Sequence, residues 1–241
     1  MNGLSGSISV IQELSQQIFQ LPENDSAIVI CPPATLLWPA CHADVTNIAF
    51  GGQDCHADAS GAHTGDVSAE MLADAGAQYV IVGHSERRAD HGETNSQVKE
   101  KADAAIRAGI TPIVCVGETR QERENGSALG VVTSQLADSI SDSAGDASIV
   151  VAYEPVWAIG TGLVPSLQDI GEMHDTIRGE LIKRFGAQGE KVAILYGGSM
   201  KPDNAAEILG VANVNGGLVG GASLKVDDFI TIIKATQKPI A

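Results

Sequence analysis

The sequence predicts a single α/β domain over residues 1–241, built from a parallel sheet with helices packed against it. Short, almost continuously apolar segments alternate with longer segments of helical periodicity from one end of the chain to the other. The pattern repeats about every 30 residues, the length of a βα unit, and no linker interrupts it. Continuous apolar runs are typical of parallel strands buried on both faces. Their alternation with helices indicates βα units joined by right-handed crossovers.

Seven segments are predicted to be strands, because each is short and apolar and each is followed by a turn or a helical pattern. They are Ala27–Cys31, Ile48–Gly51, Tyr79–Gly83, Ile110–Val116, Ile149–Tyr153, Val192–Tyr196 and Gly217–Val219. Seven strands are compatible with an open sheet, or with an eight-stranded barrel that lacks its first strand. The pattern alone favours neither.

Apolar residues recur at helical spacing between the strands. A first helix is predicted over Ile8–Leu21, ahead of the first strand. The clearest later helix begins after Ser166, which together with Asp169 resembles a capping box. Its apolar stripe consists of Ile170, Met173, Ile177 and Leu181.

Composition and charge exclude several classes of protein. Hydrophobic residues make up 44% of the chain, which excludes disorder, and no apolar run approaches the roughly 20 residues of a membrane span. The formal net charge of −15 leaves no basic surface for nucleic acid, so a site for an anion must be locally positive. The four cysteines have no metal-ligand spacing. They indicate reduced thiols and, with no signal-peptide pattern, a cytoplasmic protein.

The first segment with a chemical signature is Gly83-His84-Ser85-Glu86-Arg87-Arg88, directly after a predicted strand. A single histidine near a strand end usually has a structural role. Here it stands with a carboxylate and two arginines at the carboxyl end of a parallel strand, where α/β sheets bind their ligands. The segment therefore indicates a functional site.

The second segment runs from Ala152 to Gly162 and places Glu154 at a strand end, ahead of an apolar loop. Pro155 and the Gly160-Thr161-Gly162 run stand at the two ends of that loop. Apolar side chains on a loop are useful if it closes over a ligand and excludes water. The alternative is a packed surface loop with an ion-paired glutamate.

Two glycine-rich turns, Tyr196–Ser199 and Leu218–Ser223, follow the last two predicted strands. Backbone N–H groups at such turns form an electropositive cradle for an anion. One Gly-Gly turn is weak evidence. Two after the last two strands, however, match the phosphate site that many α/β barrels build there.

Together these segments resemble the triosephosphate isomerase family. Tyr79–Arg88, Ala152–Gly162, and Tyr196–Ser199 with Leu218–Leu224 occur in the order of the family, and the resemblance runs from Met1 to the chain end. It implies a (β/α)8 TIM barrel that interconverts dihydroxyacetone phosphate and glyceraldehyde 3-phosphate through an enediolate. It implies triose phosphates as substrates and no metal or organic cofactor.

The resemblance also implies roles for individual residues. Glu154 would be the base that moves the proton between carbons, His84 the neutral electrophile at the carbonyl oxygen, and Glu86 a third catalytic residue. The phosphate would be bound by Gly160, Ser199, Gly220 and Gly221. The lid loop would contain Pro155, Val156, Trp157, Ala158, Ile159, Thr161 and Gly162.

The runs Gly51–Asp54 and Gly61–Asp66 resemble the loop with which family members dock into a partner subunit. The resemblance implies a homodimer in which Thr64 lies near the partner's site. His63 stands where the family commonly has an aromatic residue, a departure that softens this contact. We expect a dimer that is weaker than usual.

Family members carry their first strand and an Asn-x-Lys pair just before a Met-Asn-Gly sequence, and here Met1-Asn2-Gly3 opens the sequence. We therefore expect seven strands in an open barrel, with helix Ile8–Leu21 near the slot between the family's second and eighth strands. Either Met1 is an internal residue of an ordinary enzyme, or the chain functions without the lysine. In both cases residues 1–241 alone are expected to have strongly reduced activity.

Two other functions stay open. A phosphate-metabolite-binding barrel without catalysis is supported only by the missing lysine, and intact Glu154 and loop residues speak against it. Another phosphate-binding barrel enzyme, such as a sugar-phosphate or indole-pathway isomerase, is disfavoured by the Glu154–Gly162 segment.

Overall fold

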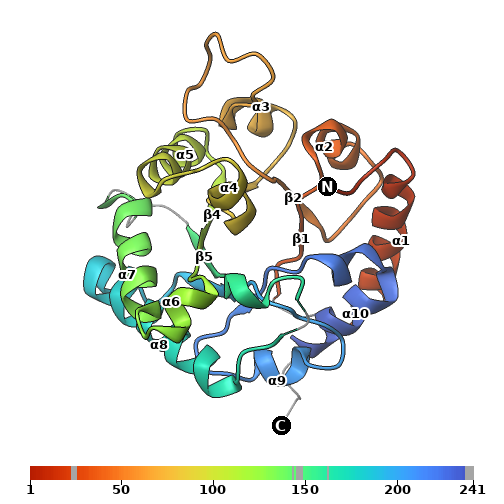
Figure 1. The fold of residues 1–241 in the computed structure, drawn as a ribbon. Helices are drawn as coiled ribbons and strands as arrows, with labels where there is room; N and C mark the ends of the chain where they lie inside the picture. Colours follow the sequence, from red (N-terminus) through yellow and green to blue (C-terminus); the bar gives the residue numbers. More distant parts are fainter. Residues whose placement is uncertain (23–25, 143, 145–148, 162, 237–241) are drawn as a thin grey trace.

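The computed structural model describes residues 1–22, 26–142, 144, 149–161 and 163–236. Seven parallel strands form one curved sheet in chain order, and helices surround it on the outside (Figure 1). The strands are β1 (Val29–Ile30), β2 (Ala49–Gly52), β3 (Tyr79–Val82), β4 (Thr111–Val116), β5 (Val150–Tyr153), β6 (Ala193–Tyr196) and β7 (Gly216–Gly217). This is the predicted fold class, a TIM-barrel-like α/β fold.

Each strand is followed by at least one helix or helical turn before the next strand begins. The α-helices are α1 (Ser7–Phe19), α2 (Ala34–Cys41), α3 (Ala69–Asp74), α4 (Ser85–Asp90), α5 (Asn95–Arg107), α6 (Arg120–Glu124), α7 (Ala128–Ser139), α8 (Leu167–Phe185), α9 (Ala205–Leu209) and α10 (Val226–Ala235). Short 3-10 helices are η2 (Val156–Ala158), η3 (Gly186–Gln188) and η4 (Gly221–Leu224). The predicted capping box of Ser166 and Asp169 is present at the start of α8. Within the described part of the chain, no helix combines the length and hydropathy that crossing a membrane requires.

All seven predicted strands form, but the prediction was wrong about the extent of the two outer ones. The first strand was predicted over Ala27–Cys31, and β1 contains only Val29 and Ile30. The last was predicted over Gly217–Val219, whereas β7 is Gly216–Gly217. Each outer strand is paired on one side only, so few ladder hydrogen bonds extend it.

The sheet is open between its first and last strands. Strands β1 and β7 are at the two ends of the strand order, and no pairing joins them among the described residues. Helix α1 lies beside α10 near this edge (Figure 1). Its buried Leu14 and Ile18 pack in one cluster with Ile230 and Ile233 of α10, and Ile30 of β1 packs against that cluster. The helix therefore lies at the open edge, as predicted.

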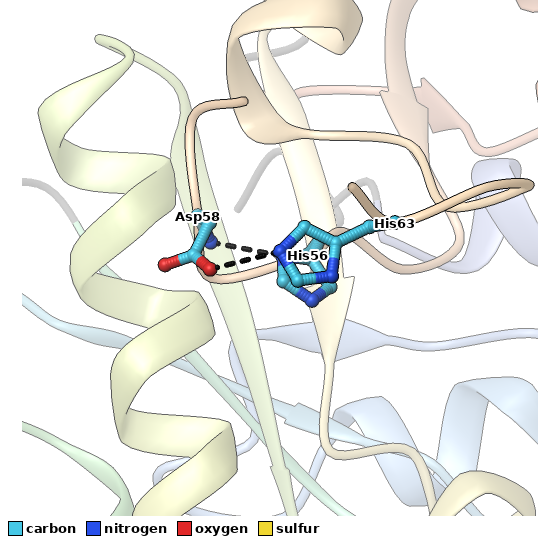
Figure 2. A group of neighbouring side chains, drawn as sticks. All are labelled: His56, Asp58 and His63. Carbon is cyan, nitrogen blue, oxygen red and sulfur yellow. Dashed lines mark hydrogen bonds and ion pairs between the residues drawn. The ribbon is translucent and has the colours of Figure 1, made fainter. Parts of the chain in front are cut away.

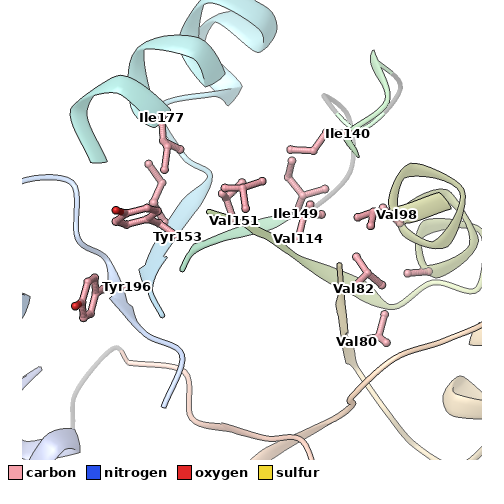
Figure 3. Close-up of a cluster of buried hydrophobic side chains, with 14 of the residues drawn as sticks. Val80, Val82, Val98, Val114, Ile140, Ile149, Val151, Tyr153, Ile177 and Tyr196 are labelled. Carbon is pink, nitrogen blue, oxygen red and sulfur yellow. The ribbon is translucent and has the colours of Figure 1, made fainter. Parts of the chain in front are cut away.

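The main core lies between the sheet and the helices. Val82, Val114 and Val151 come from three neighbouring strands and are fully buried beside helix residues such as Ile177 (Figure 3). A smaller cluster of Ile113, Cys115 and Ala152 is formed by the alternate residues of β4 and β5. Since successive side chains of a strand point to opposite faces, this second cluster fills the inside of the curved sheet. The strands that carry the site thus have both faces covered.

Candidate active site

The structure brings His84 and Glu154 together at the carboxyl ends of β3 and β5. The Nε2 atom of His84 lies 2.9 Å from Oε1 of Glu154. The backbone N–H of Ser85 donates to Oε2 of Glu154 at 2.9 Å, and the Ser85 hydroxyl donates to Oε1 at 3.3 Å. Glu154 as a whole is 1% exposed. A buried carboxylate with three donors around it is held in one position, which a general base requires.

The end of β4 lies between these two strands and makes their contact possible. The backbone N–H of Glu154 donates to the carbonyl oxygen of Val116 at 2.8 Å. A Cβ atom at Gly117 would collide with the carbonyl oxygen of Glu154. Only glycine lets the backbones approach so closely here, and this approach fixes where the Glu154 side chain begins.

Cys115 also contacts the base, from the inside of the sheet. Burial raises the pKa of its thiol well above the usual value, and the charge of Glu154 and a hydrogen bond to it raise that pKa further. The thiol is therefore a neutral donor to the carboxylate. Neither Cys115 nor Ser85 was among the predicted site residues, and their types carry no signal of such a role. Only the position of Ser85, next to His84, could have suggested it.

The contacts of His84 define its tautomer. Its Nδ1 atom accepts the backbone N–H of Glu86 at 3.3 Å, so the proton of the neutral ring is on Nε2, facing Glu154. Burial alone would lower the pKa of His84, but the hydrogen bond and charge of Glu154, together with the charge of Glu86, outweigh it and raise that pKa. The raised pKa depends on contact with Glu154. Without that contact, burial and the Glu86 N–H would favour the neutral ring.

The two arginines of the Gly83–Arg88 segment make structural contacts. Arg88 donates to the carbonyl oxygens of Gly83 and Cys115, at 2.9 and 3.2 Å, and holds α4 against the strand ends. Arg87 pairs with Glu93 and Asp54. The Glu86 side chain is 75% exposed, with its carboxylate 3.9 Å from Nδ1 of His84. The charge of Arg87 is therefore neutralised by two carboxylates, whereas Arg88 donates to uncharged backbone oxygens.

The apolar loop after Glu154 is anchored by a residue that the sequence analysis did not single out. Trp157 donates through Nε1 to Oε1 of Glu118 at 2.9 Å. The same buried oxygen accepts the Tyr153 hydroxyl at 3.1 Å and contacts the Arg123 guanidinium at 2.8 Å. Glu118 could have been predicted from the sequence, because it is a carboxylate just past the end of a strand, β4, as Glu154 is just past β5.

The other loop residues extend from this anchor toward β6. Val156, Trp157 and Ala158 form η2 after Pro155, and the carbonyl oxygen of Ala158 accepts the Ser199 hydroxyl at 2.7 Å. The loop continues through Ile159, Gly160 and Thr161, and the Thr161 hydroxyl donates to the carbonyl oxygen of Trp157 at 3.0 Å. Gly162 lies outside the described residues.

The predicted phosphate residues lie in segments that follow β5, β6 and β7. The structure brings Ser199 to the loop that contains Gly160. Gly220 and Gly221 come after β7, the neighbour of β6, at the start of η4. Both are exposed, so their backbone groups are accessible. Thr64 lies elsewhere, exposed in the loop between β2 and α3.

This fold and this site define the class: an α/β protein of TIM-barrel type with a buried carboxylate and an imidazole at its strand ends. The chain belongs to the triosephosphate isomerase family, whose model matches residues 1–236.

Individual relatives agree with this assignment. A triosephosphate isomerase from Afipia carboxidovorans is 60% identical over 236 residues, which cover 98% of this chain and 94% of the relative. One from Ruegeria sp. is 57% identical, with the same coverage of both chains. The crystal structure of triosephosphate isomerase from Bartonella henselae superposes with a TM-score of 0.89 at 44% identity, covering 99% of this chain and 96% of that one.

Proposed function

We propose that this chain interconverts dihydroxyacetone phosphate and glyceraldehyde 3-phosphate through an enediolate. The contact between the buried Glu154 carboxylate and Nε2 of His84 carries the proposal. Enolisation needs a base for the carbon-bound proton and a donor for the oxygen that gains charge. These two side chains supply both functions from the ends of β3 and β5, on either side of β4.

In the proposed reaction, Glu154 takes the proton from one substrate carbon and returns it to the other. His84 donates from Nε2 to the oxygen that becomes negative, in the neutral form that its hydrogen bond to Glu86 N–H supports. Ser85 and Cys115 orient the carboxylate before reaction. Backbone N–H groups at Gly160, Ser199, Gly220 and Gly221 would bind the phosphate, and the loop held by Glu118 would exclude water.

Substitution of the two central residues tests this assignment. Glu154→Ala is expected to abolish isomerase activity, and His84→Gln is expected to lower kcat by at least about 10²-fold, because each removes a group needed in the transition state. Glu207→Ala changes an exposed glutamate on α9 and is the matched control. A coupled assay in both directions measures the rates. An unchanged rate in Glu154→Ala would show that the site is wrongly assigned.

We further propose that residues 1–241 alone have strongly reduced activity. The lysine that the family resemblance implies would be the strongest local attraction for a phosphate dianion in a chain of net charge −15. Adding a strand that ends in Asn-x-Lys before Met1 is expected to raise kcat/KM by at least about 10³-fold, since positioning and electrostatic groups are restored. A gain below tenfold would contradict this explanation. Binding of triose phosphate without turnover, before and after the addition, would favour the non-catalytic binding protein.

The same resemblance supports a weakened homodimer formed through the loop that contains Thr64, and a cytoplasmic role in glycolysis and gluconeogenesis without nucleic-acid or membrane partners. Sedimentation at micromolar protein tests the dimer. A monomer at every concentration would refute the association, and a dimer that resists dilution would refute the weakening.

A further inference from the structure

We propose that Gln135, on helix α7, is a positioning residue that holds the backbone beside Glu154, a role that rests on the function proposed for Glu154. The side-chain amide of Gln135 makes two hydrogen bonds to one residue, Gly117. The Gly117 N–H donates to Oε1 of Gln135 at 2.7 Å, and Nε2 of Gln135 donates to the carbonyl oxygen of Gly117 at 3.0 Å. Gln135 therefore acts on the base through the backbone of Gly117.

Gly117 lies just past the end of the ladder between β4 and β5. The last residue pair of this ladder is Val116 with Tyr153. Beyond that pair, the Gln135 amide supplies a partner for both backbone groups of Gly117. A primary amide offers one acceptor oxygen and an N–H donor in the same plane, as a backbone N–H and C=O together require. Gln135 thus extends the hydrogen bonding of the sheet by one residue, from the side of the helix.

The residues around Gly117 run alongside the segment that carries the base. The backbone N–H of Glu154 donates to the carbonyl oxygen of Val116 at 2.8 Å, and that of Val156 donates to the carbonyl oxygen of Glu118 at 3.1 Å. Between these two bonds, a Cβ atom at Gly117 would collide with the carbonyl oxygen of Glu154. Because this contact joins backbone to backbone in a packed interior, a shift of Gly117 moves the backbone of Glu154 as well.

Helix α7 gives the amide a fixed support. Val132 and Leu136, on the same helix as Gln135, are buried in the main core. One turn after Gln135, the Ser139 hydroxyl accepts Nη2 of Arg88 at 3.2 Å. Residues four apart lie on the same face of a helix. The face of α7 that carries Gln135 therefore also holds Arg88 at the strand ends.

The loop between β2 and α3 shows a different kind of hydrogen bonding. There Nε2 of His63 lies 3.1 Å from Oδ2 of Asp58, and Nδ1 of His56 accepts the backbone N–H of Asp58 at 3.0 Å (Figure 2). These contacts join residues two and five positions apart, so they order a single loop. Gln135 and Gly117 are 18 positions apart. Their contact fixes a helix relative to a strand end.

The Gln135 side chain is also accessible from the surface. It lines an open hollow of about 560 Å³ together with Asn95, Ser127, Gly130 and Ser134. Its substitution therefore leaves no sealed cavity in the core, and we expect the variants to fold. A displacement of a catalytic group by about 1 Å can cost 10²-fold in rate. The loss of this clamp should consequently affect catalysis more than stability.

Substitution of Gln135→Leu removes both hydrogen bonds at a similar side-chain volume. We expect kcat for isomerisation to fall at least about tenfold, because the base is displaced from the position that the transition state requires. KM should change by less than about twofold, because the proposed phosphate groups lie in other segments. Gln16→Leu is the matched control, since it makes the same change at an exposed glutamine of α1. Circular dichroism checks that both variants are folded.

The NMR signal of the Ser85 amide proton reports the position of the carboxylate without turnover, because this N–H donates to Oε2 of Glu154 at 2.9 Å. In Gln135→Leu the signal should shift toward its position in Glu154→Ala, where the acceptor is absent. Gln135→Ala removes the same two hydrogen bonds without placing a large apolar group against Gly117. It should shift the signal in the same direction, whereas Gln16→Leu should leave the signal in place.

A shifted Ser85 signal together with the fall in kcat would support the positioning role. A Ser85 signal that is unchanged in both Gln135 variants would overturn it, and so would a shifted signal with the kcat of wild type. An inactive wild-type chain would contradict the proposed function instead. The Ser85 signal would then still show whether Gln135 holds Glu154 in place.

Discussion

The centre and the edges of the sheet differ although their sequences look alike. Strands β3 to β6 are each paired on both sides, and the ladders between them contain four residue pairs. Strands β1 and β7 are paired on one side, with two residue pairs each. The strands of both regions consist mainly of apolar or small residues. The difference therefore comes from the partners that a strand has, rather than from its own composition.

The candidate active site uses the well-paired part. His84, Cys115 and Glu154 are on or directly after β3, β4 and β5, whose faces are both covered. In the proposed reaction, a base and a donor must stay in place within a fraction of an ångström, and both benefit from such a rigid support. The edge strand β7 instead leads to Gly220 and Gly221, which would offer backbone groups to a phosphate. In the proposed reaction, the reacting side chains thus lie on the rigid centre of the sheet, and the backbone groups for the phosphate follow its edge strand.

Hydrogen exchange provides the largest expected contrast between the two regions. Backbone amides of Val114 and Val151 are expected to exchange at least about 10³-fold more slowly than those of Ile30 and Gly217, because edge strands open without unfolding the core. Native-state exchange read by NMR measures each amide. Equal, strong protection in all four would mean that the gap between β1 and β7 is filled and that the edge strands are as stable as the central ones.

Matched core substitutions give the next contrast. Ile194 on β6 is fully buried, and Ile194→Ala is expected to lower the free energy of unfolding by about 2–5 kcal/mol through lost burial and a cavity. Ile30 on β1 is partly exposed at the open edge, so Ile30→Ala should cost no more than about 1.5 kcal/mol. Urea unfolding measures both. If the edge variant lost as much as the central one, β1 would be as tightly packed as β6.

The same contrast explains how far the sequence predicts the fold. Runs of apolar residues report that a segment is buried, and they predicted the central strands to within a residue or two. They cannot report how many ladder partners a strand finds. Consequently the first strand, predicted over Ala27–Cys31, is longer than the observed β1. The last strand, predicted over Gly217–Val219, is shifted relative to the observed β7.

The candidate site was predictable where position along a strand carries the signal. His84 and Glu154 follow buried strands, and parallel strands bring such residues to one edge. Cys115 was not predictable, because its contact with Glu154 depends on the register that pairs Cys115 with Ala152.

His174, on helix α8 behind the central strands, gives the smallest of the three contrasts. Its ring is fully buried, packs edge-on against Tyr153 at 5.8 Å, and has Nδ1 3.1 Å from the carbonyl oxygen of Asn213. Burial lowers the pKa of His174 to about 4, while the hydrogen bond to Asn213 opposes this only partly. The folded protein therefore keeps the ring neutral at pH values where the unfolded chain, with an ordinary pKa of 6.5, takes up a proton.

The sign of the effect follows from that difference. The unfolded state binds more protons than the folded state between pH 6.5 and about 4, so the stabilisation is complete above pH 6.5 and is lost as the pH falls through this range. The whole effect is about 3 kcal/mol, of which about 2 kcal/mol is lost between pH 7 and pH 5.

His174→Asn keeps an N–H for the carbonyl oxygen of Asn213 and removes the titration. Urea unfolding at several pH values measures the free energy of unfolding of both proteins. Between pH 7 and pH 5, wild type should lose about 2 kcal/mol relative to the variant. If the difference in free energy of unfolding stayed constant from pH 7 to pH 5, water would reach the His174 ring. The centre of the sheet would then be covered less tightly than its contrast with the edge strands implies.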